Sequence, residues 1–203
     1  YEIANEEAAK ISHLIRVGES GMYPPAFDVG VNYYTVAQAS RFMMTYSGLR
    51  ADWTRAFLSD DSVAGTWFGY GSQHPRHPWE AMFKGYSILA WWGYLPKGLP
   101  HMAMIRPDLV PNRRFPEIGR HQIEIQKGIG RLFVQSRPAP PRVFIPYSQS
   151  SIYTANALDR DYMAATQVAV RLLAKLSLPY SFIADEQATR GKSKRLKKSL
   201  ILF

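Results

Sequence analysis

The sequence of 203 residues contains no cysteine. Disulfides, cysteine-ligated zinc, iron–sulfur clusters and cysteine nucleophiles are therefore excluded. Long hydrophobic runs are missing as well, because the longest purely apolar stretch covers only residues 88–92. A membrane-spanning helix needs about 20 apolar residues, so no membrane span is expected. No secretory segment follows Tyr1, and the apolar end at 201–203 is typical of the middle of a strand, so we expect a fragment of a larger protein.

Acidic residues are absent from the stretch 188–203, which holds six of the 25 lysines and arginines. The formal net charge of +9 depends largely on this run, because the other residues carry nineteen bases against sixteen acids. Such a local run is typical of a solvated helix or tail, so nucleic-acid binding is only the third interpretation. Apolar residues make up 46% of the sequence, which is enough to bury a core and excludes global disorder.

Short apolar segments alternate with helical patterns through the first 94 residues. The segments are apolar on both faces, which is typical of parallel strands covered by helices. We predict four parallel strands, adjacent in chain order and joined by right-handed crossovers. This α/β pattern fits half of a (β/α)8 TIM barrel or part of a doubly wound sheet, and the polar and aromatic residues after each strand favour the barrel. The expected strands are 13–17, 42–46, 63–71 and 87–92, and the expected helices are 2–12, 33–41, 52–58 and 78–86.

A second alternation begins after SRPAPP at 136–141, which is typical of a linker. Ahead of the linker, apolar residues at helical spacing predict a long amphipathic helix from 118 to 135. Beyond it, the pattern predicts the start of a flavodoxin-like α/β domain. The expected domains are therefore a half barrel at 1–136 and this second unit at 142–203. Its expected elements are strands at 142–147, 180–184 and 199–203 and a helix at 161–176.

Four stretches carry a resemblance to a known family: VAGTWFGYG at 63–71, HPWEAMFKGYSILAWWGY at 77–94, EIGRHQIEIQKGIGRLF at 117–133 and VFIPYSQSSIYTANAL at 143–158. In this order they resemble glycoside hydrolase family 42, the β-galactosidase-like barrel enzymes. The resemblance implies that 13–94 are barrel strands five to eight. It also implies that 143–158 is the first strand and loop of a flavodoxin-like trimerisation domain. A carbohydrate substrate, cleavage of glycosidic bonds, a homo-oligomer and no cofactor follow from it.

The family's reaction uses two carboxylates, one to protonate the leaving oxygen and one to attack the anomeric carbon. The resemblance places the acid/base on strand four, outside this chain, and the nucleophile at the end of strand seven. Here the strand at 63–67 is followed by Phe68-Gly69-Tyr70-Gly71, which contains no carboxylate. Either another carboxylate serves, or the chain is a catalytically inactive carbohydrate-binding or structural relative.

Glu19, in Gly18-Glu19-Ser20-Gly21 at the expected mouth of the first strand, is the candidate catalytic residue. A carboxylate there could transfer a proton or bind sugar hydroxyls, and we expect it to share a cavity with aromatic residues. The alternative is a solvated loop acid or a helix-capping acid. Glu80 is a weaker candidate, because an acid early in a helix stabilises the helix N-terminus.

Aromatic side chains stack on the apolar faces of sugar rings. Several aromatic residues lie near the expected strand ends, and with one loop histidine they are the candidate substrate-binding residues: Trp67, Tyr70, Trp91, Trp92, Tyr94 and His74. The alternative is that most of them fill the core, and alternation prevents Trp91 and Trp92 from both facing the barrel interior. A metal site at His74 and His77 would need a third ligand that the local spacing does not supply, so no metal is expected.

Overall fold

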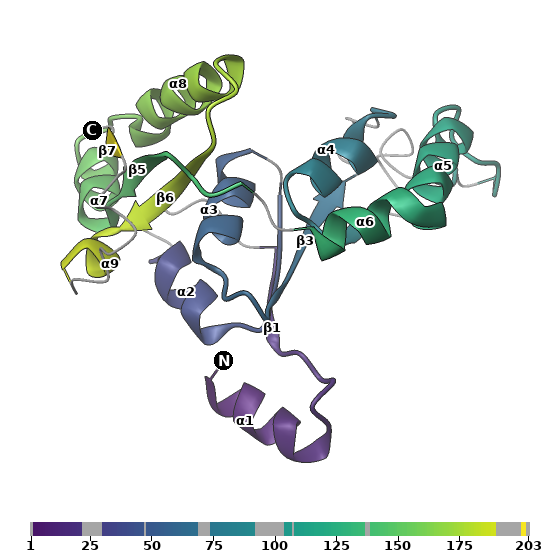
Figure 1. The fold of residues 1–203 in the computed structure, drawn as a ribbon, viewed down its shortest axis with the longest axis horizontal. Coiled ribbons are helices and arrows are strands. Elements are labelled where there is room, and N and C mark those ends of the chain that lie inside the picture. The colour runs from purple at the N-terminus through teal and green to yellow at the C-terminus, as the bar shows by residue number, and fades with distance from the viewer. Residues whose placement is uncertain are drawn as a thin grey trace.

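The computed structural model describes residues 2–21, 30–46, 48–68, 74–91, 104–106, 108–136, 139–189 and 200–201. Its first part alternates helices and strands: α1 (Glu2–Ile11), β1 (Gly18–Ser20), α2 (Tyr33–Ala39), β2 (Phe42–Thr45), α3 (Leu49–Phe57), β3 (Val63–Phe68), α4 (His77–Phe83) and β4 (Ile88–Trp91) (Figure 1). The second part comprises α5 (Phe115–Glu124), η1 (Ile125–Ile129), α6 (Gly130–Gln135), β5 (Val143–Tyr147), α7 (Gln149–Ala157), α8 (Tyr162–Lys175), β6 (Tyr180–Ala184), α9 (Asp185–Thr189) and β7 (Leu200–Ile201).

The first four strands form one sheet in the order β1-β2-β3-β4, and each neighbouring pair is parallel. The prediction of an α/β fold with parallel strands adjacent in chain order is confirmed. Local signals start the helices between the strands. The Asn32 side chain accepts the Thr35 N–H at 3.1 Å and caps α2, and Pro78 lies in the first turn of α4.

The first strand lies at 18–20, so the predicted strand at 13–17 is wrong. No described strand runs beside 13–17, and the ladder begins only where the Arg41 N–H donates to the Val17 carbonyl at 2.9 Å. Leu14 and Ile15 are exposed as a result. The apolar pattern therefore marks a segment with which none of the described strands pairs.

Two helices also differ from the expectation. Residues 149–157 form α7 rather than a loop, because the Ser148 hydroxyl accepts the Ser151 N–H at 3.3 Å and caps the helix. The long helix expected at 118–135 is divided into α5, η1 and α6. Gly128 leaves helical dihedral angles within the π-helical turn η1, which accounts for the division.

The strand register assigns side chains to two faces, since residues in register point to the same side and successive residues alternate. Met43 belongs to a buried cluster with Tyr33 of α2 and Trp53 of α3, and Phe68 belongs to one with Ala81 of α4. We call this side the helix-covered face. The opposite side, which we call the Trp67 face, carries Ser20, Met44, Gly65, Trp67, Ile88 and Ala90.

A second sheet has the order β6-β5-β7, with parallel neighbours, and is joined to the first through α3 (Figure 1). The fully buried Trp53 of α3 makes the link. Its ring lies 5.3 Å from Tyr33, 5.2 Å from Tyr147 of β5 and 6.1 Å from Phe182 of β6, each edge-to-face. One aromatic cluster therefore holds both sheets.

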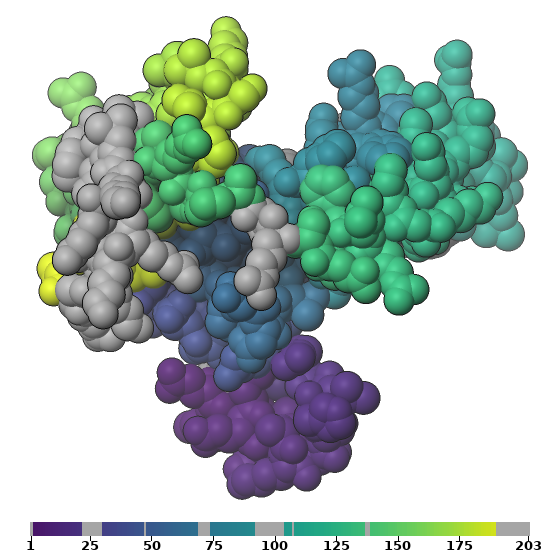
Figure 2. Space-filling model, viewed as in Figure 1, coloured from purple at the N-terminus to yellow at the C-terminus, as the bar shows by residue number. Residues whose placement is uncertain are grey.

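Helix α1 forms a lobe at one end of the molecule (Figure 2). Its Asn5 amide donates to the Ala39 carbonyl at 3.1 Å and accepts the Val17 N–H at 3.1 Å. Ile3 and Ile11 on the same helix are exposed. Asn5 thus ties the segment ahead of β1 to the end of α2.

The close approach of Gly18 to β2 gives a first testable prediction. A Cβ at Gly18 would overlap the Phe42 carbonyl oxygen and lie 2.6 Å from its carbon, so β1 would have to separate from β2. We expect Gly18→Ala to lower the free energy of unfolding by about 2–3 kcal/mol in urea denaturation. Gly119→Ala is the control, because its Cβ meets no atom within 4 Å and should stabilise α5 by about 0.5–1 kcal/mol. Unchanged stability of Gly18→Ala would contradict the pairing of β1 with β2.

Candidate functional site

The carboxyl ends of β1, β2 and β3 meet at one edge of the sheet, which is where parallel α/β proteins bind ligands. On the Trp67 face of this edge, Trp67 Nε1 donates a hydrogen bond to Ser20 Oγ at 3.0 Å. β2 separates the two strands, and neighbouring strands lie about 4.8 Å apart, so the indole extends across β2. Trp67 is half-buried and Ser20 is exposed. This edge is the candidate functional site.

Tyr46 and Arg50 add a second aromatic ring and a cation to the same edge. Tyr46 directly follows β2, one position beyond the registered pair Thr45–Thr66. The guanidinium carbon of Arg50, in the first turn of α3, lies 5.2 Å from the centre of the Tyr46 ring, which is a cation–π distance. The edge therefore combines aromatic planes with hydrogen-bond donors.

Glu19 does not share the face of Trp67. It is the middle residue of β1 and pairs in register with Met43. Because Met43 is fully buried on the helix-covered face, alternation places Glu19 on that face as well. The strand register therefore puts Glu19 and Trp67 on opposite faces of the sheet, whereas the sequence led us to expect Glu19 to share a cavity with Tyr70 and one of Trp91 or Trp92.

The other predicted site residues are also dispersed. Trp91 pairs with Phe68, and their ring centres lie 5.4 Å apart, which favours the core-filling interpretation of Trp91. His74 is exposed, and its Nδ1 accepts the Arg76 N–H at 3.2 Å. The remaining candidates are Tyr70, Trp92 and Tyr94, and all three lie outside the described residues. Residues 190–199 of the basic run lie outside them as well.

Among the described residues, Asp52 of α3 is the buried carboxylate. Its Oδ1 lies 3.2 Å from Lys84 Nζ, so the charge is paired. The strand residues of β1–β4 on the Trp67 face include no Asp or Glu. The described part of the edge therefore offers binding groups rather than an acid/base pair.

His77, at the start of α4, stacks on Phe68 with ring centres 4.8 Å apart and planes at 11°. Burial lowers the pKa of the His77 imidazole, and this outweighs the opposing effect of Glu80. The imidazole is therefore held neutral inside the helix-covered face.

This burial predicts a pH dependence of stability. Because the folded-state pKa of His77 lies below its ordinary value of 6.5, protons bind the unfolded chain more tightly. The contribution of His77 is complete above about pH 6.5 and is lost as the pH falls through the folded-state pKa. We expect His77→Phe, which keeps the stacking ring, to flatten this decline in urea denaturation at stepped pH. His74→Phe, at an exposed position, is the control, and a wild-type profile in His77→Phe would argue against the burial effect.

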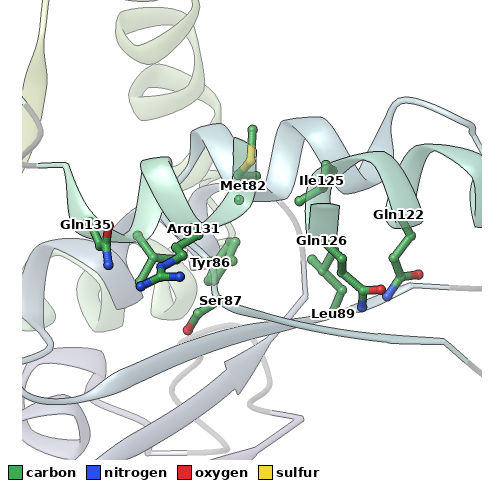
Figure 3. A pocket seen from close by; sticks show the side chains of 11 residues that line it. Met82, Tyr86, Ser87, Leu89, Gln122, Ile125, Gln126, Arg131 and Gln135 are labelled. Carbon is green, nitrogen blue, oxygen red and sulfur yellow. The ribbon is translucent and has the colours of Figure 1, made fainter. Parts of the chain in front are cut away.

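A groove of about 380 Å³ lies between α4, the start of β4 and the helices from α5 to α6 (Figure 3). Figure 3 shows Ser87 and Arg131 toward one end of the groove and Gln122 and Gln126 toward the other. Its described lining contains no carboxylate and no histidine. It therefore offers no acid/base chemistry and lies away from the Trp67 edge.

No family model matches the chain, and no curated protein matches its sequence. Within the described ranges, no group of three His, Asp or Glu side chains could hold a metal ion. The helices that the structure describes include none long and apolar enough to cross a membrane. A functional assignment therefore depends on the fold and on the Trp67 edge.

The sequence pattern did not single out Ser20, Tyr46 or Arg50. The signal for Ser20 is strand alternation, because only one of Glu19 and Ser20 can share a face with Trp67. Choosing between them requires the position of the strand. The apolar pattern ends the first strand at Val17, ahead of both residues, and so leaves that choice open.

Proposed function

We propose that β1–β4 are strands five to eight of a (β/α)8 barrel in a carbohydrate-active protein of the glycoside hydrolase family 42 type. The strand arrangement supports this proposal. A barrel requires consecutive parallel strands with their helices on one face, whereas a doubly wound sheet carries helices on both faces and reverses its strand order. The buried clusters put α2, α3 and α4 on one face of β1–β4. The Trp67 face would then line the barrel interior.

One other feature supports the second domain. The order β6-β5-β7 is the 2-1-3 order with which a flavodoxin-like sheet begins. Such a domain at 142–203 would make the protein a homo-oligomer, as the resemblance implies.

The observation that carries a carbohydrate substrate is the Trp67–Ser20 hydrogen bond at the carboxyl edge of the sheet. The indole provides a plane for the C–H face of a sugar ring. Ser20 Oγ accepts from Trp67, so its own O–H remains to donate to a sugar hydroxyl. An aromatic plane beside a directed hydroxyl is the combination that saccharide recognition needs.

Hydrolysis needs two carboxylates on the substrate side, about 5–5.5 Å apart in a retaining enzyme. In our proposal the acid/base comes from strand four, outside this chain. The sequence after β3, residues 69–73, contains no Asp or Glu to act as nucleophile. This chain therefore contributes substrate binding to the reaction.

The second candidate is a catalytically inactive carbohydrate-binding or structural relative of the same barrel family. The position of Glu19 on the helix-covered face favours it, because this removes the candidate carboxylate from the mouth. The enzyme and a carbohydrate-binding relative would both bind a saccharide at the Trp67 edge. They differ only in turnover by the protein that holds the complete barrel.

Calorimetric titration of the chain with lactose, with cellobiose for comparison, tests the shared claim. We expect saturable binding of at least one of these disaccharides. Glu19→Gln should bind within about twofold of wild type, because its side chain lies on the other face of the sheet. Loss of binding in Glu19→Gln would return Glu19 to the site, and no saturable binding of either disaccharide would refute the proposal.

A further inference from the structure

Arg50 brings a cation to the carboxyl edge of the first sheet, beside the Trp67 indole. Tyr46 directly follows β2, the strand over which the indole extends to Ser20. The guanidinium carbon of Arg50 lies over the Tyr46 ring, 5.2 Å from its centre. The Tyr46 ring therefore holds the cation within reach of a ligand that stacks on Trp67.

The charge of Arg50 is not paired with a carboxylate in the described part of the chain. Asp52, two residues further along α3, is paired with Lys84 at 3.2 Å, and Glu19 lies on the helix-covered face. The ion pairs among the described residues use other bases: Lys10, Arg41, Lys84, Arg106 and His121. An anionic group on a ligand would therefore meet an uncompensated positive charge at this edge.

The stacking of Arg50 suits it to hold such a group. A guanidinium that lies over an aromatic ring uses its face for this contact, and its N–H donors project from its edge. These donors form a planar fork that matches two oxygens of a carboxylate or sulfate. Arg50 is half-buried, so solvent screens such a pair less than it screens a fully exposed one.

We propose that the Trp67 edge prefers an acidic saccharide, one whose ring carries a carboxylate or a sulfate ester. This inference rests on the proposed function, because it names the class of saccharide that the same edge binds. The sugar ring lies against Trp67, and its acid group pairs with Arg50. The formal net charge of +9 attracts any anion, so the test must separate Arg50 from the field of the whole protein.

The test is an NMR titration with methyl glucuronide and methyl glucoside, which differ by a carboxylate in place of a hydroxymethyl group. We expect wild type to bind methyl glucuronide about tenfold more tightly, the effect of one charge-assisted contact. Arg50→Gln, with its folding checked by circular dichroism, should lower this ratio to about one. Equal affinity of wild type for the two glycosides would overturn the proposal.

Arg55→Gln is the matched control. It removes the same charge from the last turn of α3, where the exposed Arg55 side chain lies beside Gly85, ahead of β4. This variant should keep the tenfold ratio. A ratio that falls as far in Arg55→Gln as in Arg50→Gln would assign the preference to overall charge and overturn the proposal.

Two further titrations complete the test. Methyl glucoside 6-sulfate distinguishes the acid groups, because the more tightly bound of this ligand and methyl glucuronide carries the group that Arg50 holds. Lactose separates this inference from the proposed function. Saturable lactose binding without preference for either acidic glycoside overturns the inference alone, whereas no saturable binding of any of these saccharides refutes the saccharide site itself.

Discussion

Trp53→Ala is expected to lower the free energy of unfolding by about 3–5 kcal/mol, the range for truncating a buried aromatic side chain. Trp53 is fully buried, and its edge-to-face partners Tyr33, Tyr147 and Phe182 come from α2, β5 and β6. Each partner loses a contact when the ring is removed. Since domains are stable by only about 5–15 kcal/mol, the variant should be partly unfolded at modest urea concentrations.

Urea denaturation, followed by circular dichroism and by tryptophan emission, measures this loss. Trp79→Ala is the control: its half-buried ring packs on α5, where Nε1 donates to His121 Nδ1 at 3.1 Å. We expect a cost of about 1–2 kcal/mol there. Because Trp53 links both sheets, its loss should shift the unfolding of the whole core. Two separate transitions, only one of them moved by Trp53→Ala, would contradict a shared core.

The second large effect concerns ligand affinity. Trp67→Ala should weaken lactose binding about 30-fold, the effect of removing an aromatic anchor worth about 2 kcal/mol. Trp67→Phe keeps a ring but loses the hydrogen bond to Ser20, so we expect a smaller loss of about fivefold. Calorimetry or a competition assay gives both values. Trp79→Ala is again the control, and wild-type affinity in Trp67→Ala would remove the observation on which carbohydrate binding depends.

Much of the four-stranded sheet follows from local patterns. Segments that are apolar on both faces, such as 42–46 and 63–68, can be buried only between helices and neighbouring strands. The parallel direction of neighbouring strands follows, because a helix lies between consecutive strands in the sequence and can serve as the crossover connection that parallel strands need. The capping side chain of Asn32 and the early Pro78 mark helix starts by chemistry that acts within a few residues. The strands of this sheet and the starts of these helices can therefore be predicted from the sequence.

The candidate site was less predictable, because it depends on register. A shift of one residue moves every side chain of a strand to the other face. Leu14 and Ile15 resemble strand residues, yet the pairing with β2 begins at Gly18, whose missing Cβ permits close approach to Phe42. This tertiary contact decides that Ser20, and not Glu19, shares a face with Trp67.

The roles of the aromatic residues also depend on strand register. Trp67 and Trp91 both lie near the ends of strands, but the register puts Trp91 beside Phe68 on the helix-covered face. Composition alone cannot separate a core aromatic from a ligand-binding one, since both are large and half-buried. The pairing of neighbouring strands separates them.

The most direct test of carbohydrate binding on the Trp67 face is an NMR titration with lactose that follows the tryptophan indole N–H signals. We expect a saturable shift of the Trp67 signal, because its N–H is bonded to Ser20 at the proposed site. The Trp79 signal, bonded to His121 between α4 and α5, should stay in place. A titration that moves the Trp79 or Trp91 signal and leaves the Trp67 signal unchanged would contradict carbohydrate binding on the Trp67 face.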